Sequence, residues 1–247
     1  MCLTDDGHIY LYGGRSMTNA PLRDLWRFDT QYNQWEEICV SSRGNISVQP
    51  LTTSISFHGP HHSQQHSRGI TLTRSTTLDD SHRYVHTSES HESNELFQNN
   101  EPPPALQEHT MISANERLYL FGGQVGFASD ETPLWIFDLS GSTWRKFKSH
   151  LSDATSSPIG RRGHSAVVYN SNLMTIYGGY QDLKGSLSEL WIFDMKSEEW
   201  HKETDSTTHP PSRHAHSAVV YQNSMFVYGG MTDLQIRGDF WAWHFSK

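Results

Sequence analysis

The chain has 247 residues, with 19 Lys and Arg against 27 Asp and Glu, which gives a formal net charge of −8 when His is neutral. This acidic balance argues against a protein that binds nucleic acid or an anionic membrane, because both partners attract a basic surface. Hydrophobic residues make up only 35% of the chain, so either part of the chain lies outside a core or the core is built from aromatic side chains.

The chain opens MCLTDDGHIY, without the basic and apolar regions of a secretory signal. Its two cysteines, Cys2 and Cys39, are too few for a disulfide framework and are expected to be free thiols of a reducing compartment. No apolar run approaches the roughly 18–20 residues that span a bilayer. These observations favour a cytoplasmic protein without membrane insertion.

One sequence unit recurs four times along the chain. Each copy contains a diglycine at the end of an apolar run, and a Trp follows that diglycine at a nearly constant distance. The diglycines are Gly13-Gly14, Gly122-Gly123, Gly178-Gly179 and Gly229-Gly230. The first Trp of each copy is Trp26, Trp135, Trp191 or Trp241, and the first three copies add Trp35, Trp144 and Trp200. A repeat of this kind predicts an array of identical small units.

Each unit predicts four short strands, which we call A to D. Strand A is expected at 109–113, 164–169 and 216–221, and strand B at 9–14, 118–123, 174–179 and 225–230. Strand C is expected at 25–29, 134–138, 190–194 and 240–244, and strand D at 34–38, 143–147 and 199–203. The strand B segments are aromatic, β-branched and almost continuously apolar, which is typical of strands buried on both faces.

The glycines and tryptophans have separate roles in this prediction. Glycine after strand B allows a positive φ angle and a close approach of neighbouring backbones. The Trp of strand D offers a large apolar surface to the adjacent unit. Because a single four-stranded sheet cannot bury both of its faces, the sequence predicts an all-β protein in which the sheets stack radially as a β-propeller.

The diglycine, the aromatic-Asp pair at the end of strand C and the spaced tryptophans together resemble the kelch repeat. The expected blades are 1–40, 105–150, 151–204 and 205–247, with an insert at 41–104. In the fourth copy His244 replaces the Asp. Strand A of the first blade is expected to be clipped at Met1, and the fourth blade to lack strand D. We therefore expect the chain to be part of a larger propeller, with apolar sheet faces exposed at both ends.

The insert at 41–104 has no Trp, no diglycine and no periodic apolar pattern, although it holds 7 of the 16 His. It is predicted to be a disordered loop, with a decayed blade as the alternative. Three of its histidines, His61, His62 and His66, are close in sequence, but a flexible tract without Cys is expected to hold no metal. Its Ser and Thr residues allow phosphorylation.

Strand direction places the long B–C and D–A loops on one rim and the short turns on the other. Loops on a rigid core often carry function, so the long-loop rim is the predicted partner-binding surface. Its candidate residues are Arg15, Arg23, Gln124, Arg161, Arg162, Tyr180, Gln181, Lys184, Arg213, His214 and Arg237. For Arg162 and Arg213 the alternative is a framework role, bonded to backbone carbonyls. A framework role is also expected for His164 and His216, because catalysis does not need one His in every blade.

The resemblance implies a non-catalytic module that presents loops to another protein, as an adaptor, a scaffold or a substrate receptor. Arginines suit an acidic or phosphorylated partner segment. The alternative is an enzyme, since a few kelch proteins are copper radical oxidases, sugar mutarotases or iron-dependent specifier proteins. Neither cysteine is placed for the oxidase type, and no triad, HExxH or phosphate loop occurs. We therefore expect no catalytic residue, metal or cofactor.

Overall fold

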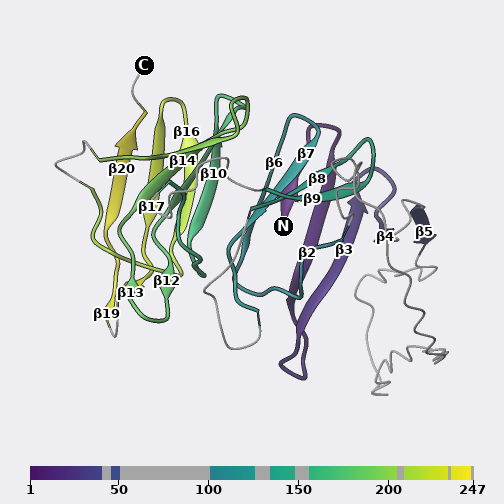
Figure 1. Ribbon diagram of the computed structural model, residues 1–247, viewed down its shortest axis with the longest axis horizontal. Coiled ribbons are helices and arrows are strands. Elements are labelled where there is room, and N and C mark those ends of the chain that lie inside the picture. The colour runs from purple at the N-terminus through teal and green to yellow at the C-terminus, as the bar shows by residue number, and fades with distance from the viewer. Residues whose placement is uncertain are drawn as a thin grey trace, which may run out of the picture. The chain divides into compact units, whose positions relative to one another are not determined.

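The computed structural model describes residues 1–40, 46–50, 101–125, 134–147, 156–204, 209–232 and 235–245. Within these ranges the chain forms strands, turns and loops, and no helix (Figure 1). Four antiparallel sheets follow one another along the chain, one from each sequence repeat. The predicted all-β class and the four blades are confirmed.

The strands lie in the order A, B, C, D across the sheets of blades 2 and 3; blade 1 adds a fifth strand after D, and the described part of blade 4 holds A, B and C. Blade 1 contains β1 (Cys2–Leu3), β2 (His8–Arg15), β3 (Pro21–Asp29), β4 (Gln34–Val40) and β5 (Ile46–Pro50). Blade 2 contains β6 (Thr110–Ala114), β7 (Arg117–Phe121), β8 (Trp135–Asp138) and β9 (Thr143–Lys146). Blade 3 contains β10 (Ser165–Tyr169), β11 (Leu173–Tyr177), β14 (Leu190–Asp194) and β15 (Glu199–Lys202). Blade 4 contains β16 (Ser217–Tyr221), β17 (Ser224–Tyr228) and β20 (Phe240–His244).

Blade 1 differs from the sequence-based expectation in one strand. Its strand A, β1, has only two residues, as expected. Strand β5, however, lies inside the predicted insert and pairs antiparallel with β4, from Val40 opposite Ile46 to Glu36 opposite Pro50. The rest of the predicted insert, apart from its last four residues, lies outside the described residues.

Two small hairpins connect strands B and C in the later blades. They are β12 (Tyr180–Gln181) with β13 (Gly185–Ser186), and β18 (Met231–Thr232) with β19 (Gln235–Ile236). Figure 1 shows β12, β13 and β19 at the same end of their sheets. Strands of two residues are too short to show an alternating pattern of apolar and polar residues, so the sequence did not predict them.

Three hydrophobic clusters form the core, and each lies between two consecutive blades. The Trp of strand D is central to the first two. Trp144 is 2% exposed, and its ring contacts Tyr12 of the preceding blade at 5.5 Å between ring centroids. Trp200 is 8% exposed and contacts Phe121 of its preceding blade at 5.4 Å. The predicted role of these rings in joining adjacent units is therefore confirmed.

The Asp at the end of strand C closes the C–D turn. The Oδ1 atoms of Asp29, Asp138 and Asp194 each accept two hydrogen bonds from backbone N–H groups two and three residues later. A carboxylate in this position accepts hydrogen bonds from backbone N–H groups that would otherwise have no partner in the turn. In blade 4 the substituted His244 instead forms a hydrogen bond between its Nδ1 and Ser224 Oγ, 2.7 Å apart.

Candidate functional site

Two of the candidate arginines are fully buried. Arg161 and Arg213 are both 0% exposed. The Arg213 guanidinium donates to the backbone carbonyls of Pro211 and Gly229, and it forms two hydrogen bonds of 3.0 and 2.7 Å with the Asp239 carboxylate. Such a pair satisfies the donors that burial would otherwise leave without partners. Arg213 therefore has the contacts that the framework alternative predicts.

Arg161 has the same arrangement in blade 3. It donates to the carbonyls of Ile159 and Gly178 and to Glu189 Oε2 at 2.7 Å. Burial raises the pKa of the Glu189 carboxyl, but hydrogen bonds from Lys202 and Arg161 outweigh this effect and lower that pKa to about 2. Arg161 therefore differs from the predicted rim position, because its side chain is enclosed by its own blade.

A buried His in each of blades 3 and 4 bonds to the preceding blade. A hydrogen bond joins His164 Nε2 to Thr110 Oγ1 at 2.7 Å, and another joins His216 Nε2 to Ser165 Oγ at 2.8 Å. In both cases the hydroxyl belongs to the residue after the His of the preceding blade. Burial lowers the pKa of His216 to about 4 and holds the pKa of His164 well below 6.5. These side chains are therefore neutral framework groups, as the sequence predicted.

The long-loop rim is organised by two repeated backbone positions. In blades 2 to 4 the residue that follows the diglycine pairs with the residue two places before the first His of the same blade, in the bridges Gln124–Gln107, Tyr180–Arg162 and Met231–His214. Because the repeat fixes the backbone of these positions, their side chains are free to differ between blades. They are the positions at which a conserved fold can display a variable surface.

The side chains at these positions form a polar network across all four blades, which we call the rim network. Arg15 Nε donates to Gln107 Oε1 at 2.5 Å, and Gln107 Nε2 donates to Gln124 Oε1 at 3.1 Å. Arg162 donates to the same Gln124 oxygen at 3.2 Å. The network thus joins blade 1 to blade 3 through side-chain hydrogen bonds alone.

The network continues from Arg162 to blade 4 through aromatic contacts. The Arg162 guanidinium carbon lies 5.0 Å from the centre of the Tyr180 ring, and that ring lies 5.1 Å from the His214 ring. His214 Nδ1 forms a hydrogen bond of 2.9 Å with Ser186 Oγ. Asp182 accepts from Arg162 at 3.0 Å, so the charge of this arginine is compensated within the rim.

The structure thus brings together five of the candidate residues and separates the others from them. The five in the rim network are Arg15, Gln124, Arg162, Tyr180 and His214. Gln107, Asp182 and Ser186 were not predicted: Gln107 is a bridge residue, Ser186 pairs with Tyr180 in the β12–β13 hairpin, and Asp182 lies on the same hairpin. Lys184 is exposed on the β12–β13 hairpin, and Gln181 is buried there.

Two further arginines lie near this rim. Arg23 was predicted in a loop but lies within β3, with an exposed side chain. The reason is a β-bulge between Tyr12 and Gly14, which lets β2 and β3 remain paired beyond the diglycine. Arg237 is half-buried just after β19. Among the described residues no carboxylate lies within ion-pair distance of Arg15, Arg23, Lys184 or Arg237.

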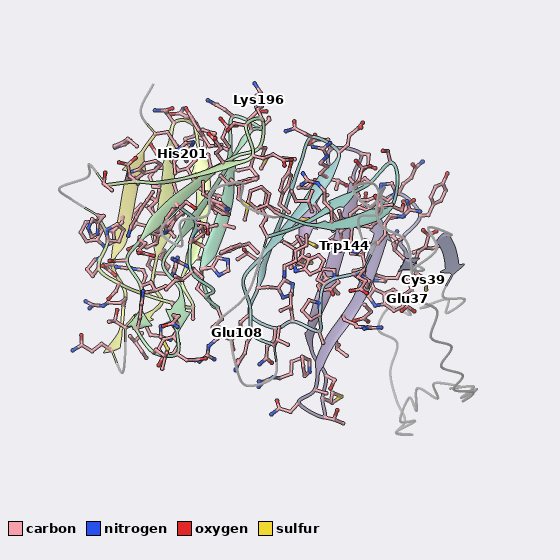
Figure 2. All side chains as sticks on the ribbon, in the orientation of Figure 1. Glu37, Cys39, Glu108, Trp144, Lys196 and His201 are labelled. Carbon is pink, nitrogen blue, oxygen red and sulfur yellow. The ribbon has the colours of Figure 1, made fainter. Side chains whose placement is uncertain are left out.

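The short-turn rim has the opposite charge near blades 1 and 2. A pocket of about 330 Å³ lies there, with acidic side chains in its lining. It is lined by Thr4, Asp5, Asp6, Ser113, Glu116, Leu139 and Ser140. Figure 2 shows Lys196 and Glu108 towards opposite ends of the strands, which marks the two rims. Within the described part of the chain no three His, Cys, Asp or Glu side chains form a potential metal site.

Comparison with known proteins agrees with this architecture. The family model described as the KLHDC2/KLHL20/DRC7 Kelch-repeats domain matches residues 72–230, and the Kelch motif model matches residues 2–38. The chain belongs to the kelch-repeat family. The larger match begins within the range that the sequence assigned to the insert. Kelch propellers in general bind other proteins, so membership supports a protein-interaction module.

Several curated proteins are similar to this kelch chain. Kelch domain-containing protein 10 of Xenopus tropicalis is 24% identical over 255 residues, which cover 97% of this chain and 60% of that protein. The putative protein tag-53 of Caenorhabditis elegans is 31% identical over 141 residues, 52% of this chain and 10% of that protein. The leucine-zipper-like transcriptional regulator 1 homolog of Drosophila melanogaster is 27% identical over 158 residues, 62% of this chain and 16% of that protein. The chain thus spans at most 60% of these relatives.

Proposed function

We propose that this kelch chain is an adaptor, scaffold or substrate receptor whose long-loop rim binds an acidic or phosphorylated segment of another protein. The observation that carries the proposal is the rim network, which holds an arginine in a fixed position. Arg15 uses only its Nε atom for Gln107. Of the described residues, none accepts a hydrogen bond from its two terminal nitrogens, which therefore remain available for a carboxylate or phosphate.

Preorganisation supports this choice of binding face. A side chain already held by a hydrogen bond loses less conformational freedom when a ligand binds. Arg162, by contrast, is partly compensated by Asp182 and contributes mainly by positioning Gln124 and Tyr180. Lys184 and Arg237 add positive charge on the same rim.

Electrostatics supports the same face. The pocket on the short-turn rim is lined by Asp5, Asp6 and Glu116, so an acidic segment is repelled there. The chain as a whole has a net charge of −8, and a local excess of cations therefore directs an acidic partner to one rim.

The test uses fluorescent peptides that contain glutamate or phosphoserine, with neutral peptides of the same length for comparison. We expect the double variant Arg15→Ala with Arg237→Ala to bind the acidic peptides at least about tenfold more weakly, since a hydrogen bond to a charged group contributes about 1.5–3 kcal/mol. Lys196→Ala removes an exposed cation from the short-turn rim and serves as the control.

Fluorescence anisotropy at two salt concentrations separates the outcomes. Acidic peptides should bind less tightly at higher salt, and neutral peptides should bind weakly at both. The proposal is wrong if Lys196→Ala weakens binding as much as the double variant does, or if neutral peptides bind as tightly as acidic ones.

A further inference from the structure

A half-buried glutamine, Gln124, lies in the middle of the rim network. Its Oε1 atom accepts two hydrogen bonds, one from Gln107 Nε2 at 3.1 Å and one from Arg162 at 3.2 Å. None of the described residues accepts a hydrogen bond from its Nε2 atom. Blade 2 packs against blade 1 on one side and blade 3 on the other, so this open position does not arise from an end of the chain.

The two arginines of the network fix which way its amides are turned. An amide has an acceptor at one end and donors at the other, whereas a guanidinium has donors only. Gln107 must therefore turn its oxygen to Arg15 Nε, which leaves its Nε2 for Gln124. Gln124 in turn must give its oxygen to Gln107 and Arg162, because the reversed amide would place N–H groups against N–H groups on both sides.

The groups that remain for a ligand are donors. Both ends of the Gln107 amide are used, and its side chain is buried. The charge of Arg162 is compensated by Asp182 at 3.0 Å and Glu108 at 3.9 Å. This leaves Gln124 Nε2, together with the terminal nitrogens of Arg15. A ligand group with its own N–H would set donors against donors, while a carboxylate or phosphate has acceptors only.

We propose that Gln124 Nε2 donates a hydrogen bond to the oxyanion of the partner segment, and that Gln124 is a specificity-determining residue. It favours a carboxylate or phosphate over a neutral group of the same shape. The inference rests on the proposed function and deepens it. In the proposed function Arg15 supplies the charge; here an uncharged amide, held in one orientation by two arginines, adds the selection for an acceptor.

The test compares peptides that differ in a single side chain. One pair has glutamate or glutamine, which have the same shape, and a second pair has phosphoserine or serine. Fluorescence anisotropy gives the preference of each protein, which is the affinity for the charged peptide divided by that for the neutral one. The parent should prefer the charged member of at least one pair by more than about tenfold, since hydrogen bonds to charged groups are the stronger ones.

Gln124→Met removes the donor without changing the charge or the length of the side chain. The preference should fall by about tenfold, which corresponds to one hydrogen bond to a charged group. Gln107→Met is the matched control. It breaks the same Gln107–Gln124 bond, but Arg162 still holds the Gln124 oxygen, so it should keep the preference even if both peptides bind more weakly.

Nuclear magnetic resonance tests the same contact without depending on a variant that binds. The side-chain amide peak of Gln124 is identified by its loss in Gln124→Met. It should shift when the charged peptide saturates the parent and stay in place with the neutral peptide. Near-UV circular dichroism of the tryptophans verifies that both variants are folded.

Two results would overturn the inference while acidic peptides still bind. One is a preference that Gln124→Met leaves unchanged, together with an amide peak that does not shift. The other is an equal fall of the preference in Gln107→Met, because loss of the internal bond would then explain both variants. If no acidic peptide binds the parent, the proposed function itself fails and this inference fails with it.

Discussion

Replacing Gly178 by Ala should destabilise the protein by more than the same change at Gly229. The two glycines occupy equivalent positions, and their φ angles are +65° and +68°. The conformational penalty of an L-residue in this left-handed region, about 1–2 kcal/mol, is therefore the same at both. What differs is the space that the new methyl group would enter.

At Gly178 a Cβ atom would lie 2.5 Å from the Arg213 carbonyl oxygen and 3.0 Å from the His216 ring. Neither neighbour moves easily, because the Arg213 side chain is buried and bonded to Asp239. Overpacking of this kind costs a further 1–3 kcal/mol or so. At Gly229 the nearest atom is the Arg237 carbonyl oxygen at 3.5 Å, an ordinary contact.

We therefore expect Gly178→Ala to lower the free energy of unfolding by about 2–5 kcal/mol and Gly229→Ala by about 1–2 kcal/mol. Urea denaturation followed by Trp fluorescence measures both. Since the loss of backbone freedom in the unfolded chain is equal for the two variants, their difference isolates the packing of the next blade. Equal losses would refute the reasoning, because conformation alone would then explain the diglycine.

Three other predictions address the framework and the insert. Trp200→Ala should lower the free energy of unfolding by about 3–5 kcal/mol, whereas an unchanged unfolding midpoint would mean that the ring does not join blades 2 and 3. His216 has a pKa of about 4 when folded and about 6.5 when unfolded, so its stabilising effect is complete above pH 6.5 and is lost as the pH falls towards 4. Between pH 7 and pH 5 the parent should lose about 2 kcal/mol more than His216→Gln in denaturant titrations; parallel losses would contradict this linkage. Limited proteolysis should cut first within 41–104, and protection there would favour the hidden blade.

The sequence predicts the blades because their diglycines and tryptophans recur at fixed separations. It does not show, however, that equivalent positions differ in their surroundings. Gly178 and Gly229 carry the same motif, and only the structure shows that one is crowded by the next blade and the other is not. Strand β5 has no landmark of the repeat, and so the range 41–104 was assigned to the insert without it.

At the candidate site, too, the sequence alone does not distinguish neighbouring residues that have different surroundings. Arg161 and Arg162 are neighbours, yet the first is enclosed and the second joins the rim network. A signal was present in the sequence: Glu189 and Asp239, the partners of the buried arginines, each stand two residues before a Trp. In blade 2 the position of the buried arginine is Leu106, and the position of its acidic partner is Pro133. Both members of the ion pair are therefore uncharged in that blade.

The hydrogen bonds between successive histidines and hydroxyls have a consequence for how such arrays evolve. His164 and His216 each bind the hydroxyl beside the His of the preceding blade, and so the joints between blades 2 and 3 and between blades 3 and 4 use the same pair of groups. Ser217, which follows His216, presents that hydroxyl once more and is exposed. Gene duplication can therefore add one repeat to the array, because the added blade bonds to its neighbours through the same His and hydroxyl groups. When a repeat is lost, the two blades that become neighbours can still form this His–hydroxyl bond. The side chains at the rim positions of each copy can meanwhile change independently.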